Sequence, residues 1–331
     1  MYQISIADAN VLKSFISIND VDFIDVFFEE HCVRFVTNST ELYAQLVLRA
    51  ERSRDESDWQ CRIHKKTLAS LGDGDILKVS KSNESVTTEF YNEYGSLEYS
   101  CSFSLQVVAD WVYQEKSAAA TCPKGLEFNS DEIVTIGKIA KLSGVGVVCV
   151  DSGVACVRLK SGARVYRRVG SSLAFSLTTK SLDALRKCSH TILSVKDWLI
   201  AQSGSFTVIA NKTRLDSNEE FSYIAECGAK FVAKIGLGKL FLFVNRLKVK
   251  TDSIVISVVD GMCCVTDTWH EYRIPIKLEG ARLAPGAECN EFSIPQSLLT
   301  GVLSPIGSNE FDLRITKNFN QLNCGEYVVV W

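Results

Sequence analysis

The sequence has little proline and no stretch of biased composition. Five prolines among 331 residues, with no low-complexity tract, argue against extended disorder. No apolar run approaches the roughly 20 residues that a membrane-spanning helix requires. The first residues, Met1 to Ile6, lack the basic start and long apolar core of a secretory signal peptide. We therefore expect a globular cytoplasmic protein with no membrane partner.

Signals for metal binding and catalysis are also scarce. The twelve cysteines include no CxxC pair, and Cys263 and Cys264 are adjacent, so we expect thiols and no zinc site. The four histidines are scattered, without cysteine or carboxylate neighbours at ligand spacing. The run from Gly236 to Lys239 lacks the spacing of a phosphate-binding loop. The sequence thus predicts no enzyme activity, no metal and no cofactor.

Length and composition are those of a multidomain globular protein. A chain of 331 residues is too long for one ordinary domain. Apolar residues make up 46% and charged residues 23% of the chain, which is typical of globular proteins. The net charge of −3 argues against a uniformly basic nucleic-acid binder but does not say where the charges lie.

The C-terminal segment contains a unit of strand, short helix and further strands. A half-apolar run from Glu291 to Ile294 predicts a strand, and Gln296 to Leu303 predicts a helix that ends before Pro305. Apolar and polar residues alternate from Phe311 to Thr316, as in a half-buried strand. A last apolar strand is expected from Tyr327 to Trp331.

The same order of elements recurs along the chain. Expected helix starts fall near residues 7, 65, 131, 179, 237 and 295, a spacing of roughly 58 residues that is typical of repeats. The clearest helix follows Ser130, a candidate N-cap, and ends at Gly144. The small residues from Ser117 to Lys124 predict a linker, and Glu279 to Glu288 are expected to join the last two copies.

Four segments of this repeat carry a resemblance to a known family: Tyr2 to Leu48, Leu126 to Val169, Lys230 to Lys277 and Phe292 to Trp331. In them the chain resembles the DNA sliding clamps, specifically the three-domain bacterial type, the beta subunit of the replicative polymerase. The likeness is one of pattern, without a short diagnostic motif. The rather short chain and its atypical ending would suit a divergent phage or mobile-element member.

The resemblance implies an α+β clamp fold. Three similar domains, each of two strand–helix–strands repeats, would place their sheets outside and their helices inside a ring. The expected domains are residues 1–116, 117–215 and 216–331. The implied function is that of a processivity factor in DNA replication, a homodimeric ring that encircles duplex DNA and tethers the DNA polymerase. The implied partners are duplex DNA without sequence preference, the polymerase, a clamp loader and a second copy of the chain.

Two alternatives remain open at this stage. One is a β-rich binding or structural module, such as a carbohydrate-binding or virion protein, without a DNA role. The other is a clamp-like processivity subunit that works as an open monomer.

Charge placement agrees with a DNA-facing set of helices. The six expected helices carry a net charge of +7, which leaves −10 for the rest of a chain whose total is −3. Such an asymmetry would hold phosphates inside an acidic ring, although short amphipathic helices also expose lysine for solubility alone. The residues expected to contact DNA are the basic residues of these helices: Lys13, Lys65, Lys66, Lys138, Lys141, Lys180, Arg186, Lys187, Lys239 and Arg246.

The resemblance also implies a pocket for partner peptides between the second and third domains. Clamps bind there a short peptide that usually carries an aromatic residue and a leucine. The matching residues are Gly162, Arg164, Val165, Val328, Val330 and Trp331. The alternative is that the valines fill a core and that Trp331 is a frayed end.

A head-to-tail dimer is the last expectation. Phe103, in the apolar strand from Ser96 to Leu105, and Val244, near the end of the fifth helix, are the expected contact residues. Pairing of these regions across a junction would remove exposed sheet edges and close a ring.

Overall fold

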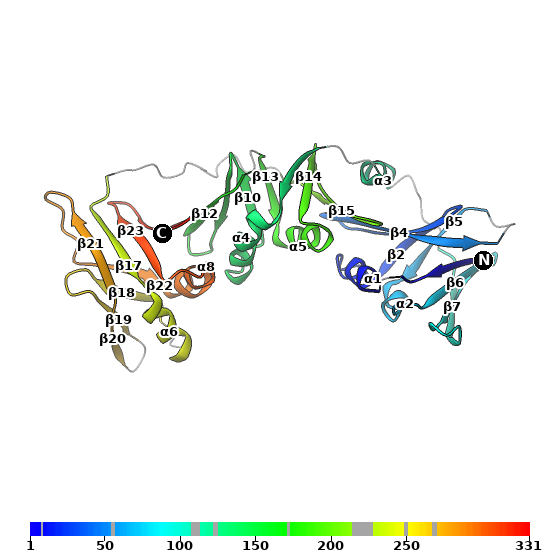
Figure 1. Ribbon diagram of the computed structural model, residues 1–331, viewed down its shortest axis with the longest axis horizontal. Helices are drawn as coiled ribbons and strands as arrows, with labels where there is room; N and C mark the ends of the chain where they lie inside the picture. Colours follow the sequence, from blue (N-terminus) through cyan, green and yellow to red (C-terminus); the bar gives the residue numbers. More distant parts are fainter. Residues whose placement is uncertain are drawn as a thin grey trace. The chain divides into compact units, whose positions relative to one another are not determined.

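The computed structural model describes residues 1–7, 9–53, 57–106, 113–121, 125–170, 173–213, 228–247, 251–266 and 270–331. The chain forms two compact units (Figure 1). Unit 1 comprises Met1–Ser130 and Ser181–Lys212, and unit 2 comprises Asp131–Lys180 and Thr213–Trp331. The three-domain boundaries after residues 116 and 215 stay a prediction, and the second of them lies outside the described residues.

Unit 1 contains one antiparallel sheet of twelve described strands. Its strands are β1 (Tyr2–Ser5), β2 (Phe23–Phe28), β3 (Cys32–Asn38), β4 (Leu42–Arg52), β5 (Trp59–His64), β6 (Ile76–Lys81), β7 (Ser85–Tyr91), β8 (Leu97–Ser104), β9 (Leu126–Asn129), β14 (Thr191–Val195), β15 (Trp198–Ser203) and β16 (Phe206–Asn211). The order is β8-β7-β6-β1-β4-β16-β15-β14-β9, and β3 and β2 join β5 to β4. Its helices are α1 (Ala9–Ile16), α2 (Lys65–Ala69), α3 (Gln114–Thr121) and, from Ser181 on, α5 (Thr179–Cys188).

Unit 2 contains a nine-stranded and a four-stranded sheet in its described part. The larger sheet comprises β10 (Val147–Asp151), β11 (Val154–Arg158), β12 (Arg164–Arg168), β13 (Phe175–Thr178), β17 (Phe231–Gly236), β21 (Lys277–Leu283), β23 (Glu310–Ile315), β24 (Asn320–Cys324) and β25 (Tyr327–Val330). Its order is β13-β10-β11-β12-β25-β24-β23-β17-β21.

The smaller sheet of unit 2 has the order β20-β19-β18-β22. Its strands are β18 (Ser253–Ser257), β19 (Met262–Thr266), β20 (Glu271–Pro275) and β22 (Glu291–Pro295). The helical segments of unit 2 are α4 (Asp131–Leu142), α6 (Gly238–Leu247), α7 (Gln296–Leu298), the π-helix η2 (Leu299–Leu303) and α8 (Ser304–Ile306).

The structure confirms six copies of strand, helix and three strands in the described chain. The copies begin at β1, β5, β9, β13, β17 and β22, and each first strand leads into a helix, namely α1, α2, α4, α5, α6 and α7. Observed helix starts lie within two residues of those expected. Among the described elements, only α3, after the second copy, and β21, after the fifth, fall outside the repeat.

Neighbouring copies exchange their first strands. The first strand of each copy pairs with the strand that follows the helix of its sister copy: β1 with β6 and β5 with β2, β9 with β14 and β13 with β10, β17 with β23 and β22 with β18. Each pair of copies is therefore interlocked by main-chain hydrogen bonds, although the sequences of the copies differ.

The last strands of the copies follow a second rule. The last strand of copy one, β4, pairs with that of copy four, β16, and the last strand of copy three, β12, pairs with that of copy six, β25. The last strands of copies two and five, β8 and β20, each pair with only one described strand. These two strands occupy the same position in their repeats. Each lies at the edge of its sheet, with one side not paired to another described strand.

Amphipathic helices cover one face of the sheets. Leu12 and Phe15 of α1 and Ile136 and Ile139 of α4 are fully or almost fully buried, whereas polar positions of the same helices are exposed. Burying each such side chain contributes about 1.5–3 kcal/mol. In unit 1, α1 and α2 lie on one side of the sheet and α3 lies on the other (Figure 1).

Two expected connections are regular elements instead. Residues 117–121 of the expected linker belong to α3, whose Ala119 packs on the Phe27–Tyr43 face of the sheet. Residues 279–283 belong to β21, which pairs with β17. Contacts with distant strands determine that α3 and β21 form. The sequence of each segment lacks the apolar periodicity that would predict a helix or a strand.

Helix ends also differ from expectation at two places. The Ser130 side chain is buried and its hydroxyl has no hydrogen-bond partner among the described residues, so it does not act as a side-chain cap. The last helix continues through a π-helix and ends at Gly307. Pro305 therefore lies inside the helical segment, where the first turn of α8 tolerates its missing N–H.

Candidate nucleic-acid interface and partner site

All ten basic residues expected to contact DNA lie on helices. Nine are exposed, and Lys65 is half-buried with its Nζ 4.0 Å from Asp20 Oδ1. Their five helices, α1, α2, α4, α5 and α6, carry a net charge of +7. The helices therefore present positive charge in a chain whose total is −3.

In unit 1 the basic side chains come from helices that lie side by side. Helices α1 and α2 are in contact, and Lys187 Nζ of α5 donates to Ser17 Oγ just after α1, at 3.3 Å. Lys13, Lys65 and Lys66 thus share one surface with the end of α5. Arg186 and Lys187 occupy the last turn of α5, where the helix dipole also favours cations.

In unit 2 the basic helices flank an uncharged one. Helices α4 and α6 both contact η2, and the stretch from Gln296 to Ile306 has no charged residue. Lys138 and Lys141 lie on α4, and Lys239 and Arg246 lie on α6. Asp131 and Glu132 lie in the first turn of α4. The Glu132 carboxylate accepts a hydrogen bond through Oε2 from the Gly170 N–H at 2.9 Å.

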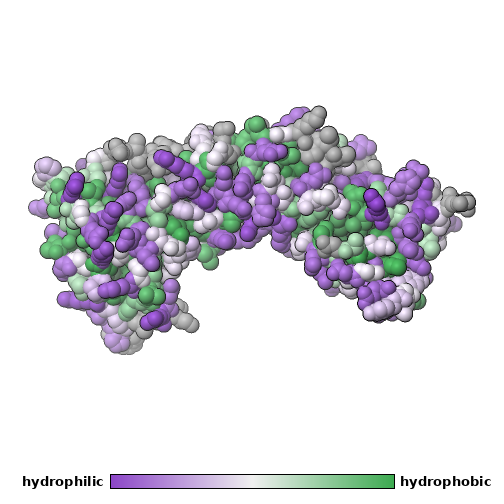
Figure 2. All heavy atoms as spheres, viewed as in Figure 1, coloured by the Kyte–Doolittle hydropathy of each residue, from purple (hydrophilic) through white to green (hydrophobic). Residues whose placement is uncertain are grey.

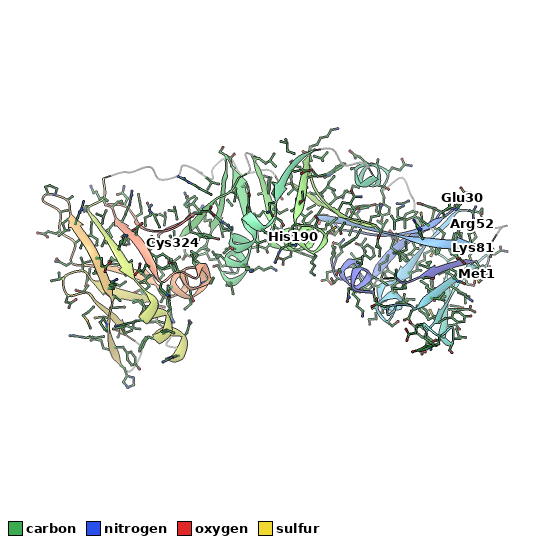
Figure 3. The ribbon with its side chains drawn as sticks, viewed as in Figure 1. Met1, Glu30, Arg52, Lys81, His190 and Cys324 are labelled. Atoms are coloured by element: carbon green, nitrogen blue, oxygen red, sulfur yellow. The ribbon has the colours of Figure 1, made fainter. Side chains whose placement is uncertain are left out.

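Other charges of unit 1 gather at a strand end. Figure 3 shows Met1, Glu30, Arg52 and Lys81 near one another at one end of this unit. Arg52 Nη1 lies 2.9 Å from Asp58 Oδ1. Burial, together with the charge of Lys81, lowers the pKa of the N-terminal amine. This group of charges lies on loops and strand ends and is separate from the helix surface.

The described residues contain no group of three or more histidine, cysteine or acidic side chains that could hold a metal ion. Among the described helices, none has both the length and the apolar character needed to cross a membrane. Hydrophilic side chains cover much of the visible face of both units in Figure 2, with hydrophobic patches between them.

The expected partner pocket corresponds to neighbouring strands of one sheet. Strand β12 pairs with β25, so that Arg164 is opposite Val330 and Val165 is opposite Val329. Side chains alternate between faces along a strand. Arg164, Val328 and Val330 therefore lie on one face, and Val165 lies on the other, where it is fully buried.

An apolar cluster occupies the Arg164 face of these strands. Cys156, Tyr166, Val328 and Val330 pack together, with the partly buried Val154 and Phe319 against them. We call these six residues the C-terminal cluster. Cys156, Tyr166 and Val328 form one continuous row across β11, β12 and β25.

Two arginines border the C-terminal cluster, whereas the terminal tryptophan, one position after Val330, lies on the opposite face of the sheet. Arg158 lies opposite Arg164 at the next position of the same face. Trp331 continues the β24–β25 ladder through main-chain hydrogen bonds with Asn320, and its indole N–H donates to Ser293 O. Trp331 is thus an ordered end of the sheet rather than a frayed one. Gly162 lies in the turn before β12 with a φ of 86°.

Sequence reasoning missed four members of this cluster: Val154, Cys156, Tyr166 and Phe319. A signal for Tyr166 was present, since it stands two positions after Arg164 and period-two alternation puts both on one face. Val154, Cys156 and Phe319 come from other segments. Only the strand pairing and the side-chain packing show that they belong to the same cluster.

The two residues expected at the dimer junction have different environments. Phe103 is half-buried on the edge strand β8, whereas Val244 is only 3% exposed inside unit 2. The exposed apolar side chain of α6 is Leu242, at 58%. On β8, Leu97 is 55% and Tyr99 42% exposed. Leu97, Tyr99 and Leu242 are thus apolar candidates for a junction that the sequence pattern did not identify.

The exchanged strands, the paired last strands and the helix-covered sheets define a DNA sliding-clamp fold. Among solved structures, the chain is similar to DNA polymerase III beta subunits from Pseudomonas aeruginosa (TM-score 0.69, 10% identity, covering 100% of this chain and 99% of that chain) and Thermotoga maritima (0.68, 11%, 100% and 98%). It is also similar to the Helicobacter pylori beta clamp bound to a DNA ligase peptide (0.68, 10%, 99% and 98%). No family model and no curated protein sequence matches the chain. At such low identity the likeness shows the fold.

Proposed function

We propose that this protein is a DNA sliding clamp, a non-enzymatic processivity factor that closes into a ring of two chains around duplex DNA. The observation that carries the proposal is the pairing of last strands. The last strand of copy one pairs with that of copy four, and the last strand of copy three pairs with that of copy six. The last strands of copies two and five, β8 and β20, remain as equivalent sheet edges among the described strands. Pairing of β8 with β20 of a second copy, repeated by symmetry, would use both edges and close the assembly.

Apolar side chains on the same elements support this junction. Leu97 and Tyr99 of β8 are exposed, and Tyr99 also hydrogen-bonds to Ser70, just after α2. On unit 2, Leu242 of α6 is exposed and Tyr272 of β20 stacks edge-on against Phe243. A junction between β8 and β20 would bring these apolar side chains together and remove them from water.

The basic helix surfaces are the proposed DNA contacts. Lysine and arginine side chains on exposed helix faces supply attraction to phosphates without reading bases. Long, mobile side chains suit a protein that moves along DNA, because each contact is weak and replaceable. The clamp tethers a DNA polymerase and requires a loader to open the ring, as the resemblance of the sequence implies.

The C-terminal cluster is the proposed docking site for partner peptides. Its partly buried members Val154 and Phe319 offer apolar surface to a leucine or an aromatic side chain, and the row of Cys156, Tyr166 and Val328 lies buried beneath them. Arg158 and Arg164 suit an acidic neighbour. The Helicobacter pylori clamp was solved with a DNA ligase peptide, so a protein of this fold binds a peptide ligand.

Native mass and retention on DNA test the function together. The chain mass is 36.7 kDa, so a ring of two chains has twice this mass. We expect that mass at micromolar concentration, and we expect loader-assisted retention on nicked circular DNA that is lost when the circle is linearised. A monomer that binds circular and linear DNA equally would reject the ring.

A further inference from the structure

Two cysteines of unit 2 lie directly opposite each other on neighbouring strands. Cys149 of β10 pairs with Cys156 of β11 in the antiparallel register. Ser152 and Gly153 join the strands, with φ values of 48° and 78°, as in the tight turns that hold a hairpin in one register. Directly opposite residues have Cα atoms about 4.5–5.5 Å apart, which is within the range of about 4.4–6.8 Å for disulfide-bonded cysteines.

The two thiols share a face and differ in burial. Directly opposed side chains lie on the same side of a sheet. Cys156 is 7% exposed within the C-terminal cluster, whereas Cys149 is half-buried. Cys149 is therefore the thiol that a small oxidant reaches first. Cys156, directly opposite on the same face, is positioned to form a disulfide with it.

No other two cysteines are directly opposite in the described strands. Cys263 and Cys264 are consecutive on β19 and thus lie on opposite faces. Burial raises the pKa of the Cys61 thiol to about 12, and its register partner on β2 is Val26. The Cys149–Cys156 pair is singled out by position rather than by the abundance of cysteine.

We propose that Cys149 and Cys156 form a reversible disulfide, a redox modification site built into the strand row of the C-terminal cluster. A small-molecule disulfide such as oxidised glutathione serves as the oxidant. The Cys149 thiolate attacks one glutathione sulfur and releases the first glutathione thiolate. The Cys156 thiolate then attacks the Cys149 sulfur and releases the second. Two electrons and two protons pass from the cysteines to glutathione, and a dithiol reductant reverses the change.

Bridge formation changes the C-terminal cluster. Opposed Cβ atoms are about 4.5–5.5 Å apart in a sheet, whereas disulfides bring them to about 3.5–4.5 Å. The bond therefore draws Cys156 toward β10 and away from Tyr166, its neighbour in the row on β12. This part of the inference rests on the proposed peptide-docking function, and the bridge itself does not.

Peptide mapping tests the bridge. The full chain is incubated with oxidised glutathione at pH 8, alkylated and mapped by mass spectrometry. We expect a product two hydrogens lighter that links Cys149 to Cys156, disappears after dithiothreitol and is absent from Cys149→Ser and Cys156→Ser. The matched control Cys264→Ser keeps it. Glutathione adducts without a Cys149–Cys156 disulfide would overturn the assignment. So would a disulfide between Cys156 and another cysteine that forms equally well in Cys149→Ser.

Peptide binding tests the consequence. A fluorescent synthetic peptide with leucine, phenylalanine and acidic residues is titrated into the reduced and the oxidised chain. We expect about tenfold weaker binding after oxidation, full recovery with dithiothreitol, and no effect of oxidation in Cys149→Ser. Equal affinity of both forms overturns the coupling to the cluster. Absence of binding in the reduced wild type counts against the docking function, while the mapping result decides the bridge separately.

Discussion

The indole Nε1 of Trp331 donates a hydrogen bond to the main-chain oxygen of Ser293 at 2.8 Å. The last residue of the chain, which follows β25 of the large sheet of unit 2, thereby contacts β22, the outer strand of the small sheet. Because β22 pairs only with β18 among the described strands, this bond also satisfies an acceptor at a sheet edge. The chain end is thus part of the packing between two sheets.

Replacing Trp331 with phenylalanine should therefore destabilise unit 2 modestly. The ring is largely kept and the hydrogen bond is lost, which typically costs about 0.5–1.5 kcal/mol. Urea unfolding, monitored by circular dichroism, measures the effect. Ser293→Ala is the matched control, because the acceptor is the main-chain oxygen; its expected change is within about 0.5 kcal/mol. Equal losses in both variants would show that the bond has no net effect.

Removing four helix cations should weaken DNA retention. Lys65, Lys66, Arg186 and Lys187 changed together to alanine should leave the fold intact, since three are exposed and Lys65 is half-buried. The slope of log affinity against log salt is negative, and each lost phosphate contact should make it less steep by about 0.9. Retention on circular DNA is measured across a salt series.

A matched variant controls for net charge. It replaces four exposed strand cations, Lys81, Lys234, Lys277 and Arg282, with alanine. Its retention should remain close to that of the wild type at each salt concentration. Equal loss in the helix and strand variants would mean that total charge, and not its placement on helices, governs retention.

Leu242→Asp should reduce the native mass to that of one chain. Leu242 is exposed on α6, so a carboxylate is tolerated in the monomer but is unfavourable if the proposed junction buries it. Native mass spectrometry at micromolar concentration measures the shift. Leu142→Asp is the matched control, an equally exposed leucine on α4, and should stay dimeric. A dimeric Leu242→Asp variant would place the junction elsewhere. Val244→Asp is unsuitable for this purpose because Val244 is buried.

The buried thiols should resist alkylation in the folded protein. Burial raises the pKa of Cys188 and of Cys263 to about 12, so almost no thiolate is present at pH 8. Iodoacetamide should label Cys264, the half-buried neighbour of Cys263, before it labels either of them. Labelling is quantified by peptide mass mapping, with a urea-unfolded sample in which all sites react. Labelling of Cys263 as fast as Cys264 would contradict the burial argument.

The same shifts set the direction of a pH effect on stability. The pKa of each buried thiol is raised on folding, so above the ordinary value near 9 the unfolded chain loses protons that the folded chain keeps. The unfolding free energy should therefore fall as pH rises from 9 toward 12. Urea midpoints at pH 8 and 10 measure this change, and Cys188→Ala, which removes one of these thiols, should show a smaller fall.

The order of elements and the helix positions could be predicted from the amino-acid sequence alone. Apolar periodicity and turn residues are local signals, so all six helix starts could be located to within two residues, and the ten basic residues were correctly placed on helices. The predictions of linkers at Ser117 to Lys124 and at Glu279 to Glu288 were wrong in part, because α3 and β21 form through contacts with distant strands.

The contacts between distant segments could not be predicted in this way, because they depend on long-range packing. Strand exchange joins segments of two sister copies, and the pairings of β12 with β25 and of β4 with β16 join residues more than a hundred positions apart. No local pattern encodes such a choice. Val244 and Leu242 are both apolar and lie in the same helix, yet packing buries the first and leaves the second exposed. Val165 and Arg164 are consecutive, and the period of two in a strand sends them to opposite faces. Composition and periodicity could therefore identify the repeated unit, whereas long-range strand pairing fixed the cluster and the open edges on which the proposed function depends.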